Sequence, residues 1–198
     1  GIQRTLPRGL VADTFEGRAW LGIVPFWMSG VRPRFCPPVP GLSRFPELNL
    51  RTYVRDGQGR AGVWFYSLEC GSPAAVWIAR TFFHLNYQNA RMPLEHGPEG
   101  WLDYRWYRRG GPRGKRVFRS HFRYRGTGGP ALAEGGSLEA FLVERYRLFA
   151  ARGEQLCTGQ VAHAPYRIQP AEVEAHNTQL MPANGIPALD RPPDHTSY

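Results

Sequence analysis

Two neighbouring segments with period-two alternation constrain the fold of this chain more than any other feature. The first runs from Glu47 to Arg55 and the second from Gly62 to Glu69, with a glycine-rich turn at 56–59 between them. Because successive side chains of a strand point to opposite faces, the pattern predicts a β-hairpin with one apolar and one polar face. The apolar face of its first strand carries Leu48, Leu50, Thr52 and Val54.

The polar face of this hairpin provides the candidate site. Glu47, Asn49 and Arg51 project together at two-residue spacing, and Glu69 ends the partner strand. A buried arginine flanked by carboxylates can hold a ligand carboxylate with two parallel hydrogen bonds, while a desolvated glutamate can act as acid or base. A cross-strand salt bridge that fixes the register explains the same residues equally well, so both interpretations stay open.

Further segments carry weaker signals for secondary structure. Residues 18–28 predict a strand in which Pro25 marks an edge, a bulge or a break, and residues 32–46, with their prolines, predict an irregular loop. Ser72 and Pro73 predict the start of a helix over 74–83. The remaining expectations are a second hairpin over 101–125, a helix from Ser137 whose apolar stripe includes Tyr146 and Phe149, and a short helix over 170–180.

Together these elements predict a single domain over residues 1–180, followed by an irregular tail over 181–198. The expected class is α+β, with a mostly antiparallel β-barrel or a strongly curved sheet and two or three flanking helices. A chain of 198 residues is long enough to bury the core of one such domain.

The net charge of +9 raises the alternative of a nucleic-acid or other anionic partner. The second hairpin concentrates this charge on the face opposite its aromatic residues. That face carries Arg105, Arg109, Arg119, His121, Arg123 and Arg125. Arginines interleaved with aromatic residues can bind phosphates and stack on bases, but a half-buried hairpin also needs a solvated outer face. The second explanation is favoured, and nucleic acid is not the expected partner.

The sequence assigns no catalytic residue, metal or cofactor. Cys36, Cys70 and Cys157 are odd in number and far apart, which argues against a disulfide framework and against a thiolate zinc site. No apolar run approaches the roughly 20 residues of a membrane span, and no signal peptide is visible. A cytoplasmic protein that binds a small molecule, without a membrane partner, is expected, and homo-oligomer formation stays open.

Several ordered motifs resemble a large bacterial family of YqjF-like proteins of unknown function. They include the segments at 6–22, 24–33, 45–54, 62–69 and 83–92, the segment that begins at Ser137, and the stretch at 169–172. The family is grouped with acetoacetate decarboxylase, so the resemblance implies an antiparallel barrel with flanking helices and an interior cavity. It also implies that the chain starts and stops inside the family pattern, either as a fragment or with divergent ends.

The resemblance implies a lyase or decarboxylase chemistry only in outline. Acetoacetate decarboxylases use a lysine with a depressed pKa to form a Schiff base, beside glutamates and an arginine. Lys115 is the one lysine of this chain, and no motif identifies it as that nucleophile. Glu47, Arg51 and Glu69 match the remaining residues in kind, so whether the chain is an enzyme stays open.

Overall fold

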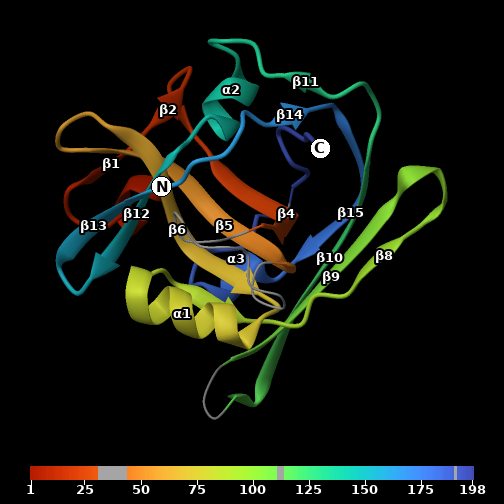
Figure 1. The fold of residues 1–198 in the computed structure, drawn as a ribbon, viewed down its shortest axis with the longest axis horizontal. Coiled ribbons are helices and arrows are strands. Elements are labelled where there is room, and N and C mark those ends of the chain that lie inside the picture. The colour runs from red at the N-terminus through yellow and green to blue at the C-terminus, as the bar shows by residue number, and fades with distance from the viewer. Residues whose placement is uncertain (31–43, 111–113, 190) are drawn as a thin grey trace.

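Two β-sheets that pack face to face form most of the structure, a computed structural model that describes residues 1–30, 44–110, 114–189 and 191–198 (Figure 1). In the view of Figure 1 the first sheet lies to the left and the second to the right, with helix α1 below the first. Within the residues described, no helix is both long and apolar enough to cross a membrane.

The larger sheet, here called sheet A, is organised around one long central strand, β5. Its strands are β1 (Leu10–Ala12), β4 (Leu21–Ser29), β5 (Arg44–Asp56), β6 (Ala61–Cys70), β7 (Tyr87–Asn89), β12 (Arg147–Arg152) and β13 (Gln155–Gln160). Strands β4 and β1 pair with successive parts of β5, and β6 pairs along its other side. Strand β6 pairs in parallel with β7 and β12, whereas the other pairings of this sheet are antiparallel.

The second sheet, sheet C, is an antiparallel sheet in the order β15–β10–β9–β8. Its strands are β8 (Leu94–His96), β9 (Leu102–Gly110), β10 (Arg116–Gly126) and β15 (Ala171–Thr178). The helices and the short strands lie outside both sheets. They are η1 (Ile2–Thr5), β2 (Thr14–Phe15), β3 (Arg18–Ala19), α1 (Pro73–Phe83), η2 (Pro98–Gly100), β11 (Ala131–Leu132), α2 (Leu138–Val143), β14 (Arg167–Ile168) and α3 (Leu180–Ala183).

The expectation of a barrel or a strongly curved sheet is wrong. The described strands form four separate sheets, and none of them closes or curls strongly. Among these strands β4 pairs with β5 alone and β15 with β10 alone, so no pairing between the described strands joins sheet A to sheet C. The apolar faces of the two hairpins are buried by packing against each other, which removes the need for closure.

The main core lies between the sheets. Leu48 and Leu50 of β5 pack against Tyr104, Trp106 and Phe118 of sheet C, and the first turn of α3 adds to the same cluster. A second cluster forms on the opposite face of sheet A, where α1 covers the start of β5 and the end of β6. Sheet A is therefore covered on both faces.

Both predicted hairpins and the helix at 74–83 are confirmed. In α1 the Ser72 hydroxyl accepts a hydrogen bond from the Ala75 amide, and Pro73 occupies the first turn. Pro25 lies in β4, which is an edge strand among the described residues, where a missing amide hydrogen is tolerated. The irregular loop predicted for residues 32–46 falls mostly outside the described residues, and its end, 44–46, belongs to β5.

Two helix predictions fail after residue 143. The helix from Ser137 has the predicted cap but ends at Val143, so Phe149 lies on β12 and packs in a cluster with Leu10 and Val54. The helix expected over 170–180 is strand β15 instead. Ala171, Val173 and Ala175 alternate with exposed polar residues, and this period-two pattern pairs with β10. Residues 184–189 and 191–198 carry little regular structure, although the backbone of Tyr198 pairs with Gln169.

A glycine makes the parallel pairing of β6 with β12 possible. A Cβ atom on Gly62 would lie 2.7 Å from the Arg147 carbonyl oxygen and 2.7 Å from the Phe149 ring. We therefore expect Gly62→Ala to lower the free energy of unfolding by about 1–3 kcal/mol, as overpacking does in cores. Urea unfolding checks this, with Gly57→Ala as control because a Cβ there meets nothing within 4 Å. Equal stability of the two variants contradicts the prediction.

Candidate functional site

The polar residues of β5 are enclosed because the strand is covered on both sides. Leu48 and Leu50 face sheet C, so Glu47, Asn49 and Arg51 face the side of α1 and α2. Glu69 is paired with Leu48 across the hairpin and therefore lies on the opposite face, toward sheet C. The structure thus brings three of the four predicted residues together and separates Glu69 from them. We call Glu47, Asn49 and Arg51 the β5 polar row.

Glu47 is a buried carboxyl group without a positively charged partner among the described residues. Only 2% of the residue is exposed, and the Tyr87 hydroxyl donates a 2.9 Å hydrogen bond to its Oε2 atom. Burial raises the pKa of Glu47 from 4.5 to about 7, and hydrogen bonds from Tyr87 and Asn49 oppose this rise only in part. A carboxyl group with a pKa near neutrality can both donate and accept a proton.

Asn49 and Arg51 each bury a polar atom that has no partner among the described residues. These atoms are the Asn49 carbonyl Oδ1 and the Arg51 guanidinium Nε. Other atoms of the Arg51 guanidinium hold it in place. Its Nη2 donates a 3.0 Å hydrogen bond to the Leu142 carbonyl of α2 and a 3.4 Å hydrogen bond to the Tyr53 hydroxyl. Gly22 lies across from it on β4, and a side chain there would press within 3.4 Å of Arg51.

Helix α2 is itself fixed by a buried ion pair. Arg145 Nη1 donates a 2.8 Å hydrogen bond to Asp13, and its Nε donates a 2.8 Å hydrogen bond to the Phe141 carbonyl. The Arg145 guanidinium also lies over the Phe141 ring. Tyr53 packs on the same ring. The carbonyl that holds Arg51 is thereby attached to both β5 and the segment that carries Asp13.

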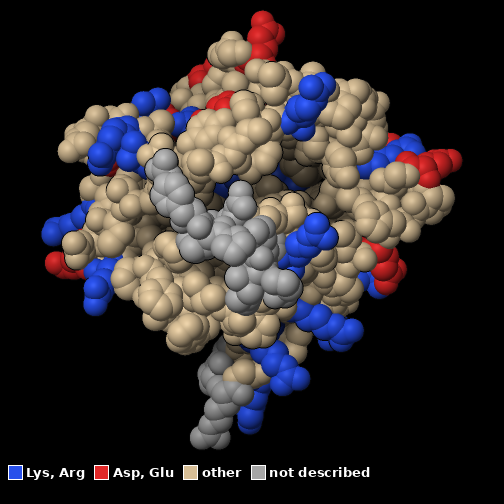
Figure 2. All heavy atoms as spheres, viewed as in Figure 1, with Lys and Arg blue, Asp and Glu red and all other residues tan. Residues whose placement is uncertain are grey.

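Figure 2 shows that the surface is hollowed on this side of the molecule, below the position that α2 has in Figure 1. Lys or Arg atoms are visible in the depth of the hollow. Since Arg51 donates to a carbonyl of α2, a basic group lies where α2 meets β5. A guanidinium held between two packed elements is suited to bind an anionic group, because the low local dielectric strengthens the attraction.

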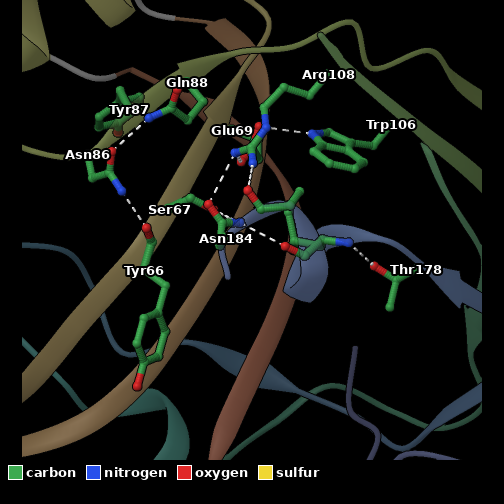
Figure 3. Close-up of polar contacts among 12 residues, drawn as sticks. Tyr66, Ser67, Glu69, Asn86, Tyr87, Gln88, Trp106, Arg108, Thr178 and Asn184 are labelled. Atoms are coloured by element: carbon green, nitrogen blue, oxygen red, sulfur yellow. Dashed lines mark hydrogen bonds and ion pairs between the residues drawn. The ribbon is translucent and has the colours of Figure 1, made fainter. Parts of the chain in front are cut away.

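Glu69 belongs to a different and fully partnered network (Figure 3). Its two carboxylate oxygens accept hydrogen bonds from Arg108, at 2.5 Å, and from the Trp106 indole, at 3.1 Å. Arg108 also donates to the Asn184 side chain and to the Ala183 carbonyl, and Asn184 donates 2.9 Å to the Ser67 hydroxyl. The network joins β6, β9 and the end of α3, so Glu69 has a structural role.

Arg108 was missed by the sequence reasoning, although its position gave a signal. It shares the inward face of β9 with Leu102, Tyr104 and Trp106, so strand alternation alone places an arginine among core residues. A buried arginine needs a carboxylate partner, and Glu69 is a buried acid on the facing sheet.

Other candidate nucleophiles and ligands lie away from the β5 polar row. Lys115 is exposed and lies in the connection between β9 and β10, directly before the first residue of β10. Cys70 is buried, and burial raises the pKa of its thiol to about 12, so it stays protonated at neutral pH. In the described part of the chain Cys70 and Cys157 are free, Cys36 lies outside it, and no group of three or more His, Cys, Asp or Glu residues there is placed to hold a metal ion.

Sequence comparison identifies relatives of the chain but no activity. Residues 1–198 match the profile of the DUF2071 family, which is described as an uncharacterized conserved protein. The chain is also 37% identical over 185 residues to the uncharacterized protein YqjF of Bacillus subtilis, an alignment that covers 93% of this chain and 74% of that protein. Neither description states a ligand or a reaction, so a functional argument depends on the geometry of this chain.

The Glu69–Arg108 pair generates a prediction about stability. Arg108→Met leaves a buried carboxylate without its counter-charge and is expected to lower the free energy of unfolding by about 3–5 kcal/mol. The double variant Glu69→Leu, Arg108→Met removes both charges and should recover most of this loss. Urea unfolding of the two single variants, the double variant and the parent chain measures the coupling. Additive losses would contradict the assigned ion pair.

The raised pKa of Glu47 generates a prediction about pH. Because the folded chain holds this proton up to about pH 7 and the unfolded chain only to 4.5, Glu47 stabilises most at low pH. Its contribution falls as the pH rises between these values, by about 3 kcal/mol in all. Glu47→Gln lacks this loss. The free energy of unfolding of the variant, measured in urea, should therefore rise relative to that of the parent chain between about pH 5 and about pH 8. A difference that is constant with pH contradicts the prediction, and Glu95→Gln, at an exposed position, controls for the change of one charge.

Proposed function

We propose that this chain, which belongs to the DUF2071 family of uncharacterized conserved proteins, binds a small carboxylate- or carbonyl-bearing molecule at the β5 polar row. One observation carries the proposal: Asn49 and Arg51 each bury a polar atom that no described residue satisfies. Most buried polar groups of folded proteins are hydrogen-bonded, because an unpaired one costs about 1–3 kcal/mol. A bound polar ligand would supply the missing partners.

The three side chains define what such a ligand offers. Arg51 presents guanidinium N–H groups, which suit a carboxylate or carbonyl oxygen, and the free Asn49 oxygen accepts from a hydroxyl or a protonated group. Glu47, two residues before Asn49, can exchange a proton near neutral pH. A lyase-like reaction fits this set of residues, and ligand binding is its first requirement.

A Schiff-base mechanism is not part of the proposal. The likeness to acetoacetate decarboxylase comes from the sequence resemblance alone, and Lys115 lies just before β10 of sheet C while the β5 polar row lies on sheet A. Any proton transfer in the proposed site involves Glu47 instead. A reducing cytoplasm suits the two described cysteines, which are free.

The contacts of the basic hairpin argue against nucleic acid as the partner. Arg123 is paired with Glu174, Arg125 with Glu172 and Glu99, and Arg105 with Asp103. These carboxylates neutralise much of the outer face, which an extended polyanion would need to be positive throughout. The small-molecule proposal is therefore the better supported of the two.

Thermal stabilisation by simple acids tests the proposal. Acetate, pyruvate and benzoate are titrated into the parent chain, and at least one should raise the melting temperature in a saturable way. Arg51→Gln should weaken this binding about tenfold or more, since charge-assisted hydrogen bonds contribute about 1.5–3 kcal/mol each. Arg44→Gln, at an exposed position of the same strand, is the control and should bind like the parent chain. Absence of any shift, or equal shifts in Arg51→Gln, would refute the proposal.

A further inference from the structure

The outer face of sheet C carries a second polar depression that the proposed function does not use. A cavity of about 450 Å³ opens there, lined by Arg105, Tyr107, Arg119, Ser120, His121, Asn177 and Gln179. This volume lies in the range of small-ligand sites. The inner face of sheet C packs on the core, so the cavity is separated from the β5 polar row by the core and by both sheets.

The strand register arranges the side chains of this face in rows that run across the sheet. Tyr107 pairs with Arg119, and the Arg119 backbone bonds in turn to Gln179 of the next segment. Arg105 pairs with His121, and His121 pairs with Asn177. Directly paired residues of an antiparallel sheet share a face, so these two rows form the floor of the cavity.

These two rows contain cations but no acid, and the acids stand in the next row. That row consists of Glu95, Asp103 and Arg123, and Glu174 closes it by binding Arg123 at 2.5 Å. The arrangement leaves a basic pocket whose one side is bordered by carboxylates. A compact anion fits within it, whereas a long polyanion would meet the acidic border.

Asp103 orients Arg105 and His121 without occupying all of their nitrogen atoms. Its Oδ1 accepts a 2.8 Å hydrogen bond from Arg105 Nε, and its Oδ2 lies 2.9 Å from His121 Nε2. Burial favours a higher pKa for Asp103, but the hydrogen bonds and charges of His121 and Arg105 lower it overall, so the carboxylate stays ionised. Among the described residues, both Nη groups of Arg105 and the Nδ1 atom of His121 have no hydrogen-bond partner.

Arg119 provides the charge that this network does not neutralise. Its residue is exposed in the second row of the cavity floor, and its side chain has no ion pair with any of the residues described. The neighbouring Asn177 and Tyr107 add neutral hydrogen-bond donors to the same cavity.

We propose that this cavity binds the phosphate group of a small phosphate ester. Arg119 and the Nη groups of Arg105 donate to the phosphate oxygens, with His121 and Asn177 completing the set. Guanidinium groups suit this role because their planar donors match the spacing of phosphate oxygens. The cavity has room for a small organic group beside the phosphate. The proposal is independent of the carboxylate site on sheet A.

Calorimetric titration of the full chain with phenyl phosphate tests the proposal, with phenol as the uncharged probe and a mixed-sequence oligonucleotide as the polyanion. Saturable binding of phenyl phosphate, without binding of phenol, is expected. Arg119→Gln should weaken it about tenfold or more. Asn177→Glu places a carboxylate in the cavity and should abolish it. Arg123→Gln, one row beyond the cavity, is the matched control and should change the affinity less than about twofold.

The same titrations contain the results that would overturn the proposal. These are no saturable binding of phenyl phosphate, equal affinity in Arg119→Gln and the parent chain, or an oligonucleotide that binds more tightly than phenyl phosphate and loses affinity in Arg123→Gln. The last result would assign the face to nucleic acid. The acid that stabilises the parent chain in the test of the β5 polar row should bind Arg119→Gln equally well, which separates the two tests.

Discussion

Coverage of β5 on both faces is the constraint on which the rest of the structure depends. Sheet C packs on one face and helices α1 and α2 on the other, so the part of the strand from Glu47 to Arg51 has no wet side for its charged residues. Every polar side chain in this part, or paired with it, must find a partner or pay for lost hydration. The ion pair of Glu69, the raised pKa of Glu47 and the unpartnered atoms of Asn49 and Arg51 all follow from this enclosure.

The two buried glutamates show how one enclosure produces opposite chemistry. Glu69 faces sheet C, where the guanidinium of Arg108 and the indole of Trp106 satisfy it. Glu47 faces α1, where Tyr87 gives one hydrogen bond and no described cation compensates its charge. The first is therefore suited to hold three segments together. The second is suited to exchange a proton, and it lies beside the side chains that still lack partners.

Local alternation predicted the hairpins well, because period two is a property of the strand itself. It also placed Glu47, Asn49 and Arg51 on one face correctly. It could not show that Glu69 points away from them, since that depends on the register of Leu48 with Glu69 rather than on spacing along one strand. Coverage of the polar face by α1 and α2 is likewise a tertiary property that no single segment contains.

The failed predictions have similar causes. At 171–178 the alternation of small apolar residues with glutamates is a strand signal, and it outweighs the preceding proline as a signal for a helix start. Phe149 fits a helical stripe in sequence. Its position in the structure depends instead on Gly62 of a distant strand, whose missing side chain leaves the space that the Phe149 ring occupies. The barrel came from the resemblance and from counting strands, and strand number does not decide whether edges meet.

The parallel pairing of β6 with β12 has a consequence for how the chain reaches its folded state. Val63 meets Leu148, so the whole of sheet C except β15 is synthesised before β6 receives this neighbour. Closing so long a loop is entropically costly and makes folding slow in comparison with local pairing. Until then this edge of β6, next to the β5–β6 turn, keeps free amide and carbonyl groups, and a nascent chain is exposed there to wrong strand partners.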